Sequence, residues 1–226
     1  MIIHILSLFP AYFHSPFDQS LIKKAREKGI LDIRLVDIRE FSKERHKKVD
    51  DTPYGGGPGM VLGPEAVCAA IRQVKKEGSK VIYLSPQGER LNHALCEELS
   101  KEKELILLSG HYEGIDERVL EKEVDREISI GDYVLTSGCP AIIVLVDAVC
   151  RFIEGVIKDP MSAQQDSFQD GLFDAPQYTR PRVFEGMEVP AILLEGDHAK
   201  IEKWRTEKKL EKTARIRPDL LKEKKS

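Results

Sequence analysis

The most informative part of the chain is Leu108-Ser109-Gly110-His111-Tyr112-Glu113-Gly114-Ile115-Asp116-Glu117-Arg118-Val119. It follows an apolar, strand-like run and contains two glycines, an aromatic residue and four charged residues. A second glycine-containing segment, residues 128–138, also begins with a short apolar run. Two loops that each leave a strand at the same edge of a sheet can form the walls of one pocket.

Working outward from these loops, strand-like and helix-like segments alternate over residues 1–157. The pattern predicts strands at 2–9, 31–38, 81–84 and 105–108, and helices at 17–28, 64–77, 91–100 and 141–153. Ser15 is expected to cap the first helix and Gly29 to end it, while Pro64 begins the second and Gly78 ends it. This alternation predicts an α/β domain, with a parallel sheet covered by helices on both faces. Ligands then bind beyond the carboxyl ends of the strands, where the loops after Leu84, Leu108 and Ile130 lie.

The composition changes near Lys158. Residues 159–172 are polar and without clear periodicity, which is typical of an interdomain linker or a lid. A small, mostly helical C-terminal domain is expected over 173–226, with a helix at 197–212 capped by Asp197 and a short helix at 215–221. Residues 198–226 hold 11 Lys and Arg against 5 Asp and Glu, a net charge of +6. Because the whole chain has a net charge of −3, residues 1–197 carry −9. The basic end indicates a polyanionic partner or, alternatively, a solvated helical surface.

Composition narrows the class of protein. At 226 residues the chain is long enough for one or two domains, and no apolar run approaches the roughly 20 residues that cross a bilayer. The N-terminus is interpreted as a first strand and not a signal peptide. The four cysteines form no CxxC pair, which favours reduced thiols in a cytoplasmic protein, and the histidines show no metal-ligand spacing. We therefore expect no membrane contact and no structural metal.

The loop at 50–60 has the most unusual composition, with Gly55, Gly56, Gly57, Pro58 and Gly59 in succession. Glycine permits positive φ and a close approach of backbone to a ligand. The loop lacks the Lys-Ser/Thr ending of a P-loop, and no GxGxxG is present. A flat purine or a ribose lying against bare backbone is one interpretation, and a flexible hairpin tip is the other.

Ordered segments over nearly the whole chain resemble the TrmD family of bacterial tRNA (guanine-N1)-methyltransferases. They include residues 7–10, 49–51, 53–60, 83–88, 112–119, 129–135, 166–168, 178–181, 184–190, 198–199, 204–205 and 217–221. The resemblance implies a SPOUT methyltransferase domain with a deep trefoil knot over 1–158, a lid over 159–172 and a tRNA-binding domain over 173–226. It also implies a homodimer with active sites at the subunit interface.

The implied reaction transfers a methyl group from S-adenosylmethionine to N1 of the guanosine immediately 3′ of the tRNA anticodon. Because N1 carries a proton, the reaction needs a general base and a group that stabilises charge on the guanine. By resemblance these are Asp166 and Arg151. From the residues alone, Asp159, Asp170 and Asp174 remain alternatives for the base, and Arg151 suits a plain surface position near a helix C-terminus.

The resemblance also assigns binding residues. The expected cofactor-binding set is Tyr83, Leu84, Ser85, Pro86, Gly110, Tyr112, Glu113, Ile130, Gly131, Tyr133, Leu135, Gly138 and Pro140. The expected substrate-binding set is Gly55, Gly56, Gly57, Pro58, Gly59 and Ser167. Glu113 is expected to attract the positive charge of the methionine part or, alternatively, to cap a helix at 115–121. A magnesium requirement is a hypothesis from the family, since no carboxylate cluster in the sequence marks a site.

The chain departs from the family pattern at three places. The run Thr136-Ser137-Gly138-Cys139-Pro140 is one residue shorter than the usual loop, His111 stands where Arg is common, and Gln177 stands where His is common. The C-terminus is also short. Two other functions therefore stay open: a related methyltransferase of ribosomal RNA, and a non-catalytic RNA-binding scaffold of the same fold.

Overall fold

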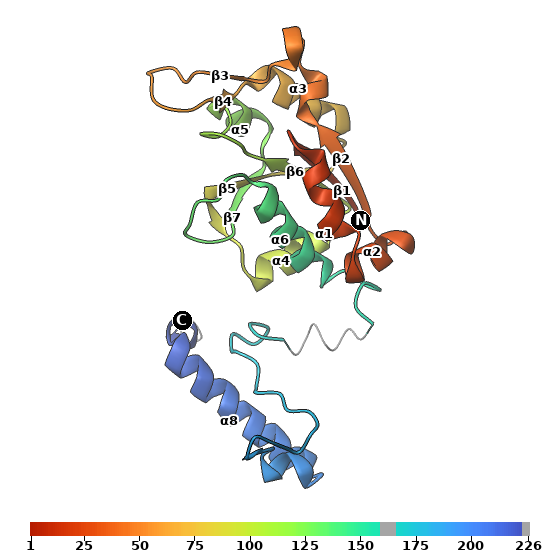
Figure 1. Ribbon diagram of the computed structural model, residues 1–226, viewed down its shortest axis with the longest axis vertical. Coiled ribbons are helices and arrows are strands. Elements are labelled where there is room, and N and C mark those ends of the chain that lie inside the picture. Colours follow the sequence, from red (N-terminus) through yellow and green to blue (C-terminus); the bar gives the residue numbers. More distant parts are fainter. Residues whose placement is uncertain (159–165, 223–226) are drawn as a thin grey trace. The chain divides into compact units, whose positions relative to one another are not determined.

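The structure is a computed structural model that describes residues 1–158 and 166–222 (Figure 1). The chain divides into two compact units, Met1–Lys158 and Asp159–Ser226, and each is described by itself. Of the predicted lid at 159–172, residues 159–165 lie outside the described residues. None of the described helices is both long enough and apolar enough to cross a membrane.

The first unit is built on a sheet of five parallel strands. They are β1 (Ile2–Ser7), β2 (Asp32–Asp37), β5 (Lys80–Arg90), β6 (Glu104–Ser109) and β7 (Arg126–Ser129), in the order β2-β1-β6-β5-β7. Successive side chains of a strand point to opposite faces, so the apolar strands supply two cores. The predicted α/β class with a parallel sheet is confirmed.

Helices cover both faces of this sheet, as predicted. On one face α1 (His14–Phe17), α2 (Ser20–Glu27), α4 (His93–Ser100) and α6 (Cys139–Cys150) bury Phe17, Leu99, Leu145 and their neighbours against Ile5, Ile82 and Leu107. On the other face α3 (Pro64–Val74) and α5 (Glu117–Glu123) bury Ile71 and Val119 against Val81 and Ile106. Each fully buried side chain of this size stabilises the fold by about 1.5–3 kcal/mol. The sheet edge that carries the loops is thereby held rigidly.

Several element boundaries differ from the prediction. The helix expected at 17–28 begins later, as α2 at Ser20, whose φ is +51°, and Phe17 instead ends the separate short helix α1. Ser15 lies inside α1 and therefore does not cap the following helix. Helix α3 ends at Val74, before Gly78, because Lys75 is already extended. Strand β5 runs on past Leu84 to Arg90, and α6 begins two residues earlier than expected, at Cys139.

The helix after the 108–116 loop also begins later than expected. Helix α5 starts at Glu117, and the carboxylate of Asp116 accepts a hydrogen bond from the backbone N–H of Arg118 at 3.0 Å. Asp116 is therefore the N-cap. The alternative role of Glu113 as a helix cap is wrong, which leaves its carboxylate for other contacts.

A short hairpin carries the glycine-rich loop. Strands β3 (Asp50–Asp51) and β4 (Val61–Leu62) pair antiparallel, and residues 52–60 connect them. The chain reaches β3 through two 3₁₀ turns, η2 (Ile38–Phe41) and η3 (Arg45–Lys47). Leu62 donates its N–H to Gly114 O at 3.0 Å, and Glu113 donates to Met60 O at 3.0 Å. These backbone bonds fix the base of the hairpin beside the loop that follows β6.

The described part of the second unit has little regular structure besides one long helix. It holds a hairpin of β8 (Val183–Phe184) and β9 (Met187–Glu188), the 3₁₀ turn η4 (Ala191–Leu194), α8 (His198–Ile216) and α9 (Asp219–Lys222). The carboxylate of Asp197 accepts from Lys200 N at 3.2 Å, which confirms the predicted cap. Helix α8 runs four residues beyond the predicted end at Lys212.

Candidate functional site

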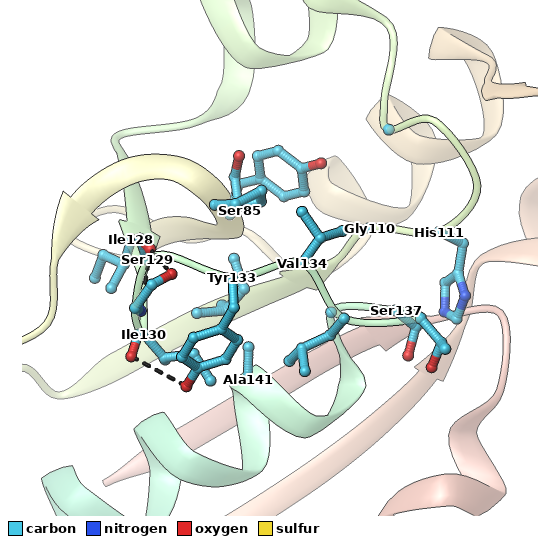
Figure 2. Close-up of a pocket in the computed structure, with 18 of the residues that line it drawn as sticks. Ser85, Gly110, His111, Ile128, Ser129, Ile130, Tyr133, Val134, Ser137 and Ala141 are labelled. Carbon is cyan, nitrogen blue, oxygen red and sulfur yellow. Dashed lines mark hydrogen bonds between the residues drawn. The ribbon is translucent and has the colours of Figure 1, made fainter.

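A pocket lies at the carboxyl edge of the sheet, where parallel α/β proteins bind their ligands (Figure 2). Three segments line it: the middle of β5, the loop after β6 and the segment from the end of β7 to the start of α6. The lining residues are Tyr83, Leu84, Ser85, Pro86, Gly110, His111, Tyr112, Glu113, Gly114, Ile128, Ser129, Ile130, Gly131, Tyr133, Val134, Leu135, Thr136, Ser137, Gly138 and Ala141.

The β5 side of the pocket results from an irregularity in the strand. The pairing of β5 with β7 shifts register between Leu84 and Glu89, so residues 85–88 leave the regular ladder. Gly88 lies so close to the backbone of Glu127 and Ile128 that a Cβ there would collide with both. The bulge brings Ser85 and Pro86 to the pocket while the strand continues beyond them.

The loop after β6 forms a second side and approaches β5 closely. A Cβ on Gly110 would lie 2.7 Å from the hydroxyl oxygen of Tyr83, so a larger residue does not fit there. Burial raises the pKa of Tyr83 to about 12, which keeps its hydroxyl protonated at neutral pH. Tyr112 has a φ of +60°, an uncommon conformation for a residue with a side chain. The strain lies next to Glu113, whose carboxylate is exposed at the pocket.

The third side is an exposed segment with little support of its own. Ser129 Oγ accepts from Gly131 N at 3.2 Å, and the hydroxyl of Tyr133 donates to Ile130 O at 3.3 Å. Figure 2 shows the Tyr133 ring folded back over Ile130. Beyond it Val134 is 84% exposed. At the far end Gly138 donates its N–H to Gly110 O at 2.8 Å, which ties this segment to the loop after β6.

The structure brings together most of the residues that the sequence singled out for the cofactor. Twelve of the thirteen line this pocket, and the exception is Pro140, which lies in the first turn of α6 without lining it. The sequence reasoning left out His111, Gly114, Ile128, Ser129, Val134, Thr136, Ser137 and Ala141. Most of them lie between predicted residues in the same segments, so treating each loop as a continuous wall would have included them.

The glycine-rich loop lies against the same site. The side chain of Glu113 occupies the space where a Cβ of Gly59 would stand. Gly55, Gly56 and Gly57 have positive φ and no heavy atom within 4 Å of a Cβ position, so their backbone is open to a ligand. Tyr54 is fully exposed beside them. The structure thus places the predicted guanine-binding loop next to the predicted cofactor pocket.

The two predicted catalytic residues belong to different units. Arg151 is the exposed C-cap of α6 in the first unit. Asp166 is half-buried at the beginning of the described part of the second unit, where Ser167 Oγ accepts from Asp174 N at 2.9 Å. Of the alternative bases, Asp170 accepts from Leu172 N at 3.1 Å and Asp174 accepts from Ala175 N at 2.7 Å, while Asp159 lies outside the described residues.

Comparison with known proteins decides the family. A family model described as tRNA (Guanine-1)-methyltransferase TrmD matches residues 1–223. The chain belongs to the TrmD family. The tRNA (guanine-N(1)-)-methyltransferase of Protochlamydia amoebophila is 62% identical over 221 residues, which cover 98% of this chain and all of that protein. The protein of the same name from Dictyoglomus turgidum is 52% identical, over 97% of this chain and 89% of the relative.

A third relative is longer than this chain. The tRNA (guanine-N(1)-)-methyltransferase of Chlamydia pneumoniae is 56% identical over 97% of this chain, but the match covers 61% of that protein. TrmD proteins therefore occur at the length of this chain and with additional sequence. The pocket and the glycine-rich loop lie within the part that all three relatives share.

Proposed function

We propose that this protein methylates N1 of the guanosine immediately 3′ of the tRNA anticodon, with S-adenosylmethionine as methyl donor. The observation that supports this best is the meeting of twelve predicted cofactor residues around one pocket, with the glycine-rich loop against it. Membership of the TrmD family gives the reaction class. The remaining roles are assigned to residues by their resemblance to the family, and the chemistry that the reaction requires is consistent with them.

The pocket suits a methyl donor that carries an adenosine and a positive charge. Two of its sides consist largely of backbone, because Gly110 and Gly138 leave no room for side chains, and free backbone groups suit the edge of an adenine. The exposed carboxylate of Glu113 offers a counter-charge for the methionine part. The cavity holds about 210 Å³, less than the roughly 300 Å³ of typical ligand pockets, so we expect residues 131–137 to move outward on binding.

Asp166 and Arg151 complete the chemistry in this proposal. S-adenosylmethionine supplies an electrophilic methyl group on a sulfonium. Asp166 takes the proton from guanine N1, and the freed lone pair forms the bond to the methyl carbon while the carbon–sulfur bond breaks, leaving S-adenosylhomocysteine. The guanidinium of Arg151 stabilises the negative charge that develops on O6 of the guanine. A carboxylate with an ordinary pKa near 3.9 is a weak base for this proton, so the cation beside the guanine is needed to lower the barrier.

The substrate side uses both units. The open backbone of Gly55, Gly56, Gly57 and Gly59, with Pro58, would hold the guanine after it leaves the anticodon stack. Ser167 would contact the substrate beside Asp166. Helix α8 of the second unit is basic and exposes Lys203, Lys212 and Arg215, which would bind phosphates of the anticodon stem.

Three further properties follow from family membership as proposals. Residues 1–158 form a knotted SPOUT domain, a proposal that rests on membership of the TrmD family. Two copies assemble as a homodimer, which would cover exposed apolar side chains such as Tyr12 and Val144. The protein works in the cytoplasm, where tRNA is modified. A magnesium requirement is also proposed, and unchanged activity under thorough chelation would exclude it.

The test is methyl incorporation from labelled S-adenosylmethionine into unmodified tRNA transcripts. One transcript carries guanosine 3′ of the anticodon and the control carries adenosine. We expect incorporation into the first alone, and loss of it with Asp166→Ala. Donor binding without incorporation into tRNA would favour the ribosomal-RNA alternative, which a ribosomal transcript then tests. Absence of donor binding by calorimetry would favour the scaffold, the alternative that the shortened 136–140 loop supports.

A further inference from the structure

Two of the places where this chain departs from the TrmD pattern meet in space. His111 follows β6, whereas Cys139 is the first residue of α6. The Nε2 atom of His111 lies 3.7 Å from Sγ of Cys139, and both residues are buried. This contact joins two buried residues from distant segments of the chain.

The thiol of Cys139 also contacts two serines that end neighbouring strands. Ser109 Oγ, on β6, lies 3.3 Å from Sγ, and Ser7 Oγ, on β1, lies 3.5 Å from it. Ser7 Oγ in turn accepts from Phe9 N at 3.0 Å, and the Phe9 ring packs edge-on against His111 with centroids 5.0 Å apart. One sulfur atom thus joins the carboxyl ends of β1 and β6 to the first turn of α6.

This cluster lies directly behind the pocket. Cys139 is not a lining residue, but its neighbours His111, Ser137 and Gly138 are. Figure 2 shows His111 and Ser137 side by side at one end of the pocket. Cys139 N donates to Ser137 Oγ at 3.3 Å. A displacement of Cys139 would therefore move the loop after β6 and the segment before α6 together.

The surroundings of this thiol differ from those of the other buried cysteines. Burial raises the pKa of Cys139, but hydrogen bonds from His111, Ser109 and Ser7 outweigh that effect and lower it to about 7. Burial alone raises the pKa of Cys96 to about 11. His111 is the titratable side chain that contacts the sulfur, while β1, β6 and the segment before α6 present the hydroxyls of Ser7, Ser109 and Ser137.

We propose that Cys139 and His111 are positioning residues of the methyl-donor pocket, which fix the loop 110–114 and the segment 131–138 at the spacing that the donor requires. The inference rests on the proposed function, since it takes the donor to bind in this pocket. The contacts of the thiol with the imidazole and two hydroxyls join the two walls at their base.

The experiment measures the dissociation constant of S-adenosylhomocysteine by calorimetry with the full-length protein. Cys139→Ala should weaken binding by about 10-fold, the effect of losing one or two hydrogen bonds. Cys139→Ser keeps a polar group and should recover most of the affinity. Cys96→Ala is the matched control, because it truncates a buried cysteine of the same core far from these hydroxyls, and it should leave the dissociation constant within about 2-fold.

Two further measurements distinguish a positioning role of Cys139 and His111 from a general loss of structure. The ratio of the wild-type and Cys139→Ser dissociation constants should change between about pH 6 and about pH 8, because the thiol ionises in that range and the serine hydroxyl does not. In a double-mutant cycle, Cys139→Ala and His111→Ala should be non-additive. Equal losses for Cys139→Ala and Cys96→Ala, or a pH-independent ratio, would overturn the inference while donor binding by the wild type stands. Absence of binding to the wild type would overturn the proposed function as well.

Discussion

The two units of this chain differ in how many buried side chains stabilise each of them. The first unit has a buried cluster on each face of its sheet, and its pocket rests on both. In the described part of the second unit only Leu172, Ala175 and Thr213 are buried, while Phe184, Met187 and Ile216 are each more than half exposed. The first unit can therefore present a preformed donor pocket. The second unit instead exposes apolar side chains, which RNA or a protein partner would cover in the proposed complex.

The largest effect should come from the base, which lies in the less supported unit. Asp166→Asn keeps the shape of the side chain but removes its basicity, so we expect the methylation rate to fall by about 10²- to 10⁴-fold. Donor binding should remain unchanged, because the pocket belongs to the first unit. The measurement is single-turnover methylation together with calorimetry of S-adenosylhomocysteine.

Asp170→Asn is the control for that substitution. Asp170 accepts a hydrogen bond from Leu172 N nearby in the same segment, so its loss tests the local structure and not the proton transfer. A rate loss as large for Asp170→Asn as for Asp166→Asn would show that the segment matters and that the base is not identified. A loss of donor binding in either variant would break the distinction between a preformed pocket and a dependent second unit.

The next effect should come from crowding the preformed pocket. A Cβ at Gly138 would lie 2.9 Å from Gly110 N and 3.2 Å from Ser109 Cα, and backbone cannot rotate away as a side chain can. Gly138→Ala should cost about 1–3 kcal/mol and weaken donor binding by about 10-fold or more, because the two loops are forced apart.

Gly63→Ala is a matched control for this substitution. Gly63 is also a helix N-cap with a proline in the first turn of its helix, but the nearest atom to its Cβ position is Val49 O at 3.5 Å, an ordinary contact. Both variants lose the same backbone freedom, so the difference between their donor affinities isolates the clash at Gly110. Equal affinities would mean that the loops yield readily and that the pocket is not rigid.

A smaller effect should appear in the salt dependence of tRNA binding, which we assign to the second unit, and not in donor binding, which we assign to the first. Replacing Lys203, Lys212 and Arg215 of α8 with glutamine should weaken tRNA binding several-fold and reduce its dependence on salt concentration, since fewer counterions are released. Donor binding should not respond. Filter binding at several salt concentrations measures this, with Lys23→Gln and Lys101→Gln on the first unit as the control. An unchanged salt slope would remove α8 from the proposed tRNA interface.

The sequence predicted the first unit better than the second for a physical reason. Apolar strands such as those ending at Ser7 and Ser109 have one stable arrangement, and parallel strands bring their loops to one edge, so the pocket could be assembled in advance. The register shift after Leu84 and the turn at Ser20 could not be predicted, because each depends on a local backbone crossing that leaves no periodic signal. The proximity of His111 to Cys139 was also hidden, since neither residue is unusual by itself.

The smallest expected effect is a change of thermal stability with pH. It tests whether the cluster around Cys139, which supports the pocket, is formed without any ligand. The unfolded thiol of Cys139 has an ordinary pKa of 9.0, whereas the folded one has a pKa of about 7, because hydrogen bonds outweigh the opposing effect of burial. Between these pH values the unfolded chain still holds the proton that the folded chain has lost, so stability rises with pH. The gain is complete above about pH 9 and is lost as the pH falls through about 7.

We therefore expect the melting temperature of the wild type, relative to Cys139→Ser, to rise by a few degrees between about pH 7 and about pH 9, at ~2–4 °C per kcal/mol. Burial raises the pKa of Cys96 to about 11 and that of Cys150 to about 12. Both thiols contribute equally to the stability of the two proteins, so their contributions cancel in this difference. The measurement uses the free protein, without donor or tRNA. A constant difference would mean that the cluster around Cys139 forms only when a ligand binds. The first unit would then depend on its partner as the second unit does.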